Sequence, residues 1–350
     1  MGAATTDRAA TARADELHDR VQRVVERYAF ADGETFDTLA RMLAVHQATY
    51  DPGYRRLCDA RGVEPTSDAP STLPAVPTEA FKLTRVATFA GDADQAVFRT
   101  SGTTMGGRGV HALRRLDTYR RSALRSAEVH LWPRRTAVLA IAPTPEQLPD
   151  SSLSCMLGWF VEAWGGRFLE PDQPAAAIDA IASLTEPTVI CATAFAWVHL
   201  LDAGLAARLP PGSRAMQTGG FKGRSREISA SELRGAMAQA LGIAASDIVG
   251  EYGMTELSSQ LYAEGGETLR YVAPPWVRVS AADPGTLGPL PPGSPGVLRI
   301  EDLANVESAW AVQTADMGVV HVDGSVEILG RALFAPPRGC SLAIEEMLDR

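Results

Sequence analysis

Hydrophobic and polar residues alternate along the chain in two rhythms, one typical of amphipathic helices and one of short buried strands. Near the N-terminus, apolar residues recur at helical spacing between charged ones, at Leu17, Val21, Val24, Val25 and Tyr28. In the centre, strand-like apolar runs cover residues 136–143, 187–193 and 246–253, and helical patterns cover 152–166 and 231–242. Strands that alternate with helices predict parallel sheets flanked by helices, an α/β fold.

The pattern changes after about residue 270, where helical periodicity disappears. Short strand-like segments cover 296–302, 317–324 and 325–331, and a hairpin turn is expected at Asp323-Gly324. We therefore predict an α/β core over residues 1-270, a small β-rich, barrel-like subdomain over 271-331, and a C-terminal tail over 332-350.

Composition narrows the class of partner. The 350 residues carry 42 acidic and 33 basic side chains, for a net charge of −9, whereas proteins that bind nucleic acid usually have the opposite balance. The four cysteines lie far apart and form no C-x-x-C pair, so neither a disulfide framework nor a zinc site is expected. Without a signal-peptide core or an apolar run of about 18 residues, we expect a cytoplasmic protein with no membrane span.

A stretch rich in hydroxyls and glycines follows the strand-like residues 97–99. It reads Thr100-Ser101-Gly102-Thr103-Thr104-Met105-Gly106-Gly107-Arg108-Gly109. Glycines let backbone N–H groups turn toward an anion, and hydroxyls donate further hydrogen bonds, so the composition suits a phosphate-binding loop. The stretch is neither a G-x-x-x-x-G-K-[ST] nor a G-x-G-x-x-G motif, and an ordinary surface loop is the alternative.

This loop resembles the (S/T)-S-G-T-T-G phosphate loop of the adenylate-forming (ANL) superfamily, which includes acyl-CoA synthetases, peptide-synthetase adenylation domains and luciferases. Met105 stands where the pattern usually has glycine, and Gly106 follows one place later. The resemblance implies the large N-terminal domain of these enzymes as the fold, with residues 1-270 as its ATP- and acid-binding core and residues 332-350 as a truncated C-terminal tail. It also implies that ATP phosphates contact Thr100, Ser101, Gly102, Thr103, Thr104 and Gly106.

A second motif, Glu251-Tyr252-Gly253-Met254-Thr255-Glu256, resembles the superfamily's Y-G-x-T-E. The resemblance implies that Tyr252 stacks on adenine, that Thr255 contacts phosphate, and that Glu251 and Gly253 belong to the nucleotide site. Glu256 would hold Mg²⁺, which prefers carboxylate oxygens. The alternative is a strand end followed by a helix that Thr255 and Glu256 merely cap.

Three shorter elements resemble further parts of the superfamily's nucleotide site. Gln217-Thr218-Gly219-Gly220 is similar to the glycine-rich segment beside adenine, Thr314-Ala315-Asp316-Met317-Gly318 to the T-x-D-x-G motif, and Gly330-Arg331 to the hinge. The aspartate of the second motif, here Asp316, would accept hydrogen bonds from the ribose. Each element alone is as typical of a plain turn, but all five motifs follow one another in the order of the superfamily.

The chain has 19 residues after Arg331, so the usual C-terminal domain and its lysine are not expected. The LuxE-type acyl-protein synthetases of bacterial luminescence have this shape. Three segments resemble that branch: Phe81-Lys82, Thr218-Gly219-Gly220-Phe221-Lys222-Gly223 and Arg338-Gly339-Cys340-Ser341-Leu342. In that branch the acyl group moves from acyl-AMP to a cysteine near the C-terminus and then to a reductase.

Five residues complete the candidate site. Cys340 would be the acyl acceptor, with Arg338 lowering the pKa of its thiol, although an inert cysteine is the alternative. Lys82, and after it Lys222, would neutralise charge at the reacting phosphate and carboxylate, unless each is a solvated surface lysine. Phe195 and Trp197 would line the acid pocket, or are ordinary core aromatics.

The function predicted is ATP- and Mg²⁺-dependent activation of a small-molecule carboxylic acid to acyl-AMP. The acyl group would pass to Cys340 or to an external reductase or carrier protein. Two alternatives stay open: adenylation of an aryl acid in a natural-product pathway, and a catalytically weak nucleotide-binding partner that delivers substrate to another enzyme.

Overall fold

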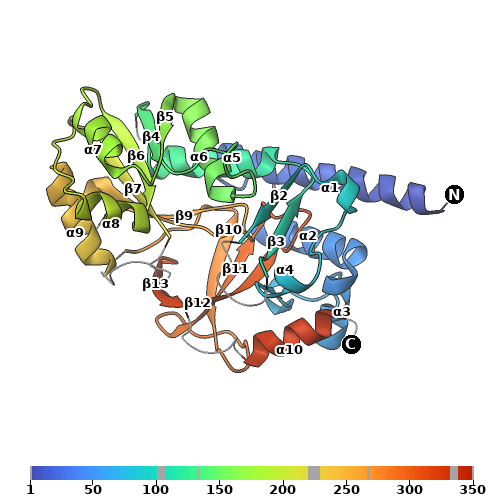
Figure 1. Cartoon of the computed structure of the whole chain (residues 1–350). Helices are drawn as coiled ribbons and strands as arrows, with labels where there is room; N and C mark the ends of the chain where they lie inside the picture. The colour runs from blue at the N-terminus through green and yellow to red at the C-terminus, as the bar shows by residue number, and fades with distance from the viewer. Residues whose placement is uncertain are drawn as a thin grey trace. The chain divides into compact units, whose positions relative to one another are not determined.

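The structure is a computed structural model that describes residues 2–100, 107–132, 134–219, 229–265, 269–331 and 338–348, without the side chains of residues 2–7 and 338–340 (Figure 1). The chain forms two compact units. The first comprises residues 1–125, 254–259 and 273–350, and the second comprises 126–253 and 260–272. The units are interleaved in sequence and do not follow the predicted boundaries at residues 270 and 331, which stay a prediction.

The second unit is built on a six-stranded sheet in the order β5-β4-β6-β7-β8-β9. Its strands are β4 (Ala137–Ile141), β5 (Gly166–Leu169), β6 (Thr188–Thr193), β7 (Arg214–Thr218), β8 (Ile248–Tyr252) and β9 (Leu261–Ala263). All neighbours pair in parallel except β8 and β9. The predicted parallel sheet is therefore confirmed. The central residues of β6, 189–192, are all apolar and buried, as expected of a strand that is covered on both faces.

The same unit contains the helices α6 (Ser152–Trp164), α7 (Pro174–Ala182), α8 (Ala194–Asp202) and α9 (Ala230–Leu241), and the short 3-10 helix η3 (Ala245–Asp247). Their ends follow local chemistry. Ser229 and Glu232 form a capping box at the start of α9, and Gly242 ends that helix in the left-handed conformation. One face of the sheet packs with α7, α8 and α9 into an apolar core.

The first unit holds a second sheet in the order β1-β12-β11-β10, with β13 paired to β12. Its strands are β1 (Val76–Pro77), β10 (Val277–Ala282), β11 (Pro295–Asp302), β12 (Ala311–Val320) and β13 (Val326–Arg331). Pairing is antiparallel except between β1 and β12. The expected hairpin turn at Asp323-Gly324 is confirmed, since Val320 pairs with Val326 across it.

The predicted strand over residues 317–324 was wrong in its limits. The observed β12 begins at Ala311 and ends at Val320. Its first half is buried against β11, while Val322 is 92% exposed in the turn that follows. The turn therefore takes the last residues that the pattern had given to the strand.

Helices α1 (Gly2–Arg27), α2 (Phe36–Tyr50), α3 (Pro52–Ala60), α4 (Ala80–Leu83) and α10 (Arg338–Met347) also belong to the first unit, with the 3-10 helices η1 (Pro70–Thr72) and η2 (Gly91–Ala93). Figure 1 shows α10 beside α3, and Arg56 of α3 donates two hydrogen bonds to the backbone oxygen of Met347. Helix α5 (Asp117–His130) begins in the first unit and ends in the second. None of the described helices is both long enough and apolar enough to span a membrane.

Strands β2 (Ala96–Arg99) and β3 (Val110–Leu113) form a separate antiparallel pair in the first unit. Arg99 pairs with Val110, so the glycine- and hydroxyl-rich stretch connects the two strands. This pair, called the loop hairpin below, fixes where that stretch begins and ends.

Candidate functional site

The base of the glycine- and hydroxyl-rich loop is closed by hydrogen bonds in the first unit. The Thr100 N–H donates to Gly109 O at 3.0 Å, and the Gly109 N–H donates back to Thr100 Oγ1 at 2.8 Å. Arg108 donates to the Thr100 and Arg99 carbonyls, so its guanidinium also braces the base. The predicted phosphate contacts at Ser101, Gly102, Thr103, Thr104 and Gly106 lie outside the described residues.

Glu256 is the centre of a charged group in the first unit. Its side chain is nearly buried, at 6% exposure, and burial raises the pKa of its carboxyl to about 7. The charges of Glu79 and Asp316 raise that pKa further, whereas Arg331 lowers it. The structure therefore brings Glu256, Asp316 and Arg331 near one another.

Arg331 and Asp316 face each other across paired strands. They are register partners on β13 and β12, and Arg331 Nε lies 3.5 Å from Asp316 Oδ1. Lys82 joins the group through Glu79, whose Oε1 lies 3.9 Å from Lys82 Nζ. Glu79 also accepts a hydrogen bond from Thr78 Oγ1 at 2.9 Å. Three acidic and two basic side chains thus lie near one another at the edge of the sheet that β12 and β13 form.

A divalent cation fits this group only with help from other ligands. Among the described residues, no three His, Cys, Asp or Glu side chains lie close enough to hold a metal ion by themselves. Mg²⁺ is commonly bound through one or two carboxylates, with substrate phosphates and water completing its shell. A carboxyl whose pKa is raised mainly by burial, and further by two neighbouring acids, matches that use, because a bound cation would favour its ionised form.

In the second unit, candidate residues line the carboxyl ends of neighbouring parallel strands. Thr193, Thr218 and Glu251 are register partners on β6, β7 and β8. Ligands of open α/β sheets bind at such strand ends. Gly219 follows β7 with φ +73°, a conformation that favours glycine, and is exposed. Its partner in the motif, Gly220, lies outside the described residues.

Glu251 is a buried acid that pairs with a hydroxyl. Thr218 Oγ1 donates to Glu251 Oε2, yet burial dominates and raises the pKa of the Glu251 carboxyl to about 7. A Cβ at Gly253 would lie 2.6 Å from Glu251 Oε1, so this glycine leaves room for the carboxyl. The half-buried Tyr252 meets Tyr271 edge to face, with ring centroids 6.0 Å apart.

The two aromatic residues predicted for the acid pocket differ in environment. Phe195 is 39% exposed at the start of α8. Trp197 is fully buried in the apolar core, and its Nε1–H donates to Met216 O at 2.9 Å. This placement favours the alternative of an ordinary core residue for Trp197 and leaves Phe195 as the accessible candidate.

The cysteines are distinguished by burial. Cys58 and Cys191 are both buried, and burial raises the pKa of each thiol, for Cys58 to about 11, which makes them poor nucleophiles. The backbone of Cys340 lies in the first turn of α10, while its side chain is outside the described residues. Lys222 is outside them as well.

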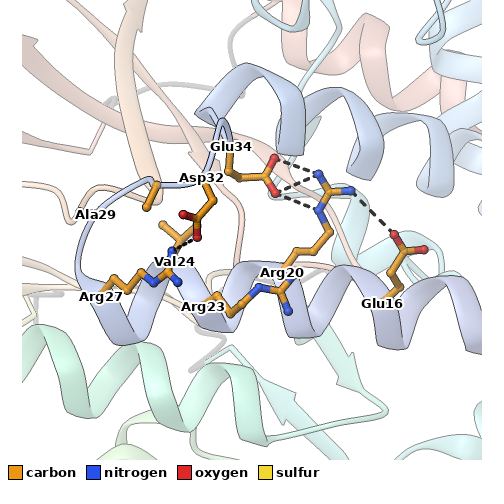
Figure 2. Close-up of a pocket in the computed structure, with 9 residues that line it drawn as sticks. Glu16, Arg20, Arg23, Val24, Arg27, Ala29, Asp32 and Glu34 are labelled. Atoms are coloured by element: carbon orange, nitrogen blue, oxygen red, sulfur yellow. Dashed lines mark hydrogen bonds and ion pairs between the residues drawn. The ribbon is translucent and has the colours of Figure 1, made fainter.

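A cavity of about 370 Å³ beside α1 contains none of the predicted site residues (Figure 2). Arg20 forms two hydrogen bonds with Glu34, and Arg27 pairs with Asp32 at 2.5 Å. Because its basic side chains are matched by acidic ones, we interpret it as a solvated, charge-balanced surface.

Sequence reasoning missed four residues that belong to these groups. Glu79 lies beside Lys82, and His111 and Asn305 bond the backbone oxygens of Thr255 and Glu256. Asp302 accepts from the backbone N–H of Ser258, in the same segment as Glu256. Asn305 Nδ2, for example, donates to the backbone oxygen of Glu256 from 49 residues away. No local pattern marks such contacts, and only the folded chain reveals them.

Comparison with known sequences finds a family and one relative. The family described as acyl-protein synthetase, LuxE, matches residues 177–349. The long-chain-fatty-acid–luciferin-component ligase of Vibrio harveyi is 34% identical over 79 residues, which cover 21% of this chain and 21% of the relative. The match thus spans about a fifth of that relative's length.

Solved structures show the same fold. A 2-hydroxyisobutyryl-CoA ligase in complex with 2-HIB-AMP and CoA aligns with a TM-score of 0.64 and 15% identity, over 87% of this chain and 76% of the ligase. ATP-bound MatB from Rhodopseudomonas palustris aligns at 0.53 and 20%, over 69% and 49% of the two chains. The amide bond synthetase McbA from Marinactinospora thermotolerans aligns at 0.52 and 17%, over 69% and 50%. These matches confirm the predicted resemblance: the chain has the fold of the N-terminal domain of adenylate-forming enzymes, and its residues 177–349 match the acyl-protein synthetase family, LuxE.

Proposed function

We propose that this chain is an adenylate-forming ligase that activates a carboxylic acid with ATP. The observation that carries the proposal is the convergence of Glu256, Asp316 and Arg331 in one charged group, on a fold shared with a ligase that holds an acyl-AMP. The three residues are 75 residues apart in sequence at most and come from three different motifs. Grouping two acids near a third, buried one raises the pKa of the buried carboxyl, and a bound cation would offset that cost.

The proposed reaction has two steps. A carboxylate oxygen of the substrate attacks the α-phosphorus of ATP, a new P–O bond forms, and the bond to the bridging oxygen breaks to release pyrophosphate. A nucleophile then attacks the acyl carbonyl, and AMP leaves with the oxygen that joined it to the acyl group. Mg²⁺ bound to the phosphates would supply charge neutralisation in the first step.

The roles of individual residues follow from their charges and positions. Glu256 would ligate Mg²⁺, and Asp316 would accept hydrogen bonds from the ribose hydroxyls. Arg331 and Lys82, the basic members of the group, would face the negative charge of the reacting phosphate and carboxylate. In the second unit, Tyr252 would stack on the base.

The acyl acceptor that we propose is the Cys340 thiol. The family match includes this residue, and the two described cysteines that are fully buried have thiols of raised pKa. An external reductase or carrier protein would receive the acyl group next. A fatty acid is the first candidate substrate, because the Vibrio harveyi relative is named a long-chain-fatty-acid ligase.

Acid-dependent ATP–pyrophosphate exchange tests the proposal. Fatty, aromatic and amino acids are each supplied to the wild type, to Glu256→Gln, and to Glu301→Gln as a control. Glu301 is similarly buried, at 4% exposure, but pairs with Arg299 on β11. We expect exchange with one class of acid, its loss in Glu256→Gln, and its retention in the control. ATP binding without acid-dependent exchange would instead favour a partner that delivers substrate.

Intact mass spectrometry tests the acceptor. After incubation with ATP and the active acid, the wild type should gain the mass of one acyl group that hydroxylamine removes. Cys340→Ser should gain nothing, whereas Cys155→Ser should behave like the wild type. An acyl group that persists in Cys340→Ser would contradict this part of the proposal.

A further inference from the structure

The segment of residues 254–259, which carries Thr255 and Glu256, is held by side chains from elsewhere in the first unit. His111 Nδ1 lies 2.7 Å from Thr255 O, and Asn305 Nδ2 donates to Glu256 O at 2.8 Å. The backbone N–H of Ser258 donates to Asp302 Oδ2 at 2.9 Å. The backbone around Glu256 is therefore fixed on both sides of that residue.

His111 differs from the other two anchors in where it comes from. Asp302 ends β11, and Asn305 lies in the connection between β11 and β12, so both come from the five-stranded sheet and its connections. His111 instead lies on β3, two residues after the Gly109 that closes the loop hairpin. Among the three anchors, it alone ties the loop hairpin to the segment that carries Glu256.

The chemical state of His111 follows from its surroundings. A carbonyl oxygen only accepts, so Nδ1 must carry the proton that is donated to Thr255 O. His111 is 1% exposed, and burial lowers the pKa of its imidazole to about 4, so the ring is neutral at physiological pH. Its Nε2 has no hydrogen-bond partner among the described residues, so this side chain keeps one buried polar atom unsatisfied.

The ring orientation is also fixed by packing. Phe81 meets the imidazole edge to face, with ring centroids 5.8 Å apart. Phe81 precedes Lys82 on α4, and a Cβ at Gly109 would lie 3.5 Å from the Phe81 Cβ. His111 therefore sits among α4, the base of the loop hairpin and the segment of Glu256.

We infer that His111 is a positioning residue that sets the Thr255–Glu256 backbone relative to the loop hairpin through its hydrogen bond to Thr255 O. The inference rests on the proposed function, in which the loop and the Glu256 carboxylate act on the same Mg·ATP. Misplacement of reacting groups by about 1 Å can cost on the order of 100-fold in rate. The hydrogen bond from His111 to Thr255 O therefore affects how the loop hairpin and Glu256 are placed relative to each other, which ordinary core packing of His111 would not do.

The test compares ATP binding with and without Mg²⁺. His111→Leu removes the hydrogen-bond donor and replaces the imidazole with an apolar side chain of similar size. His111→Asn restores a donor, because an asparagine Nδ2 occupies about the place of histidine Nδ1. His46→Leu is the matched control, since His46 is 3% exposed, bonds Thr88 Oγ1 through Nε2, and lies outside the proposed site. Calorimetric titrations use ATP with Mg²⁺ and ATP with EDTA.

We expect His111→Leu to weaken Mg·ATP binding about tenfold, because it removes one buried hydrogen bond. The affinity for ATP in EDTA should stay within twofold of the wild type. His111→Asn should recover most of the affinity, and His46→Leu should show no change in the ratio of the two affinities. Equal weakening with and without Mg²⁺, or a His111→Leu protein that behaves like His46→Leu, would overturn the inference. The binding titrations need no carboxylic acid substrate. A wild type that binds Mg·ATP but shows no ATP–pyrophosphate exchange would therefore contradict the proposed function, while the comparison of the His111 variants would still test the inference.

Discussion

The buried carboxyl of Glu251 makes a prediction that can be worked from the structure. Burial raises its pKa from 4.5 to about 7, so between these values the folded chain keeps a proton that the unfolded chain has lost. Stability therefore falls as pH rises from 4.5 to 7 and is constant above that range. Each pKa unit corresponds to 1.36 kcal/mol, so above pH 7 the raised pKa of Glu251 lowers the free energy of unfolding by about 3 kcal/mol.

Replacing Glu251 with glutamine removes this cost, because the amide stays neutral and its oxygen can still accept from Thr218. We expect Glu251→Gln to match the wild type near pH 4.5 and to be more stable by about 3 kcal/mol at pH 8. Urea unfolding followed by tryptophan fluorescence at pH 5, 6, 7 and 8 measures the difference. Trp197, in the same unit, is a buried reporter.

Glu186→Gln is the control for this experiment, since Glu186 lies in the same unit but is exposed. Its stability difference from the wild type should be small at every pH. A difference between Glu251→Gln and the wild type that does not change with pH would refute the reasoning. It would mean that the Glu251 carboxyl ionises as freely in the folded chain as in the unfolded one.

Substitutions at three further positions test the packing that positions the site. Gly166→Ala should abolish folding, because its Cβ would lie 1.9 Å from Val138 O at φ +129°, and loss of soluble protein is the readout. Arg114→Met should lower the free energy of unfolding by about 3–5 kcal/mol in a denaturant titration, because the buried Glu307 would lose its closest cation. A change below about 1 kcal/mol would contradict a stabilising Arg114–Glu307 ion pair. Asp302→Ala should cost about 3 kcal/mol in the same assay because it removes three buried hydrogen bonds, and Asp302→Asn should cost less.

Local chemistry made much of the fold predictable. The helix predicted over residues 231–242 is observed at Ala230–Leu241, where a capping box and a left-handed glycine mark its ends. The strand predicted over residues 187–193 is observed at Thr188–Thr193, because its central residues form the continuous apolar run of a buried parallel strand. In each case the signal lies within the element itself.

Long-range pairing was not predictable in the same way. Val76 pairs with Val312 in parallel, and residues 254–259 belong to a different unit from the residues on either side of them. Acidic side chains are usually exposed, yet Glu301, Asp302 and Glu307 are buried in hydrogen-bond networks. Such burial depends on partners far away in sequence.

The candidate site divides along the same line. Glu256, Asp316 and Arg331 could be named in advance because each lies in a short motif and the motifs keep their order. Glu79 and His111 could not be named, because neither lies in a motif and the residues that link them to the site, Glu256 and Thr255, are distant in sequence.

The central claim is that a carboxylate attacks the α-phosphorus of ATP, and oxygen transfer tests it most directly. The active acid is labelled with ¹⁸O in its carboxylate, and the nucleotide and phosphate products are analysed by mass spectrometry after acyl transfer. The account predicts one ¹⁸O in AMP and none in pyrophosphate. ADP as the product, with ¹⁸O in inorganic phosphate, would show attack at the γ-phosphorus and contradict it.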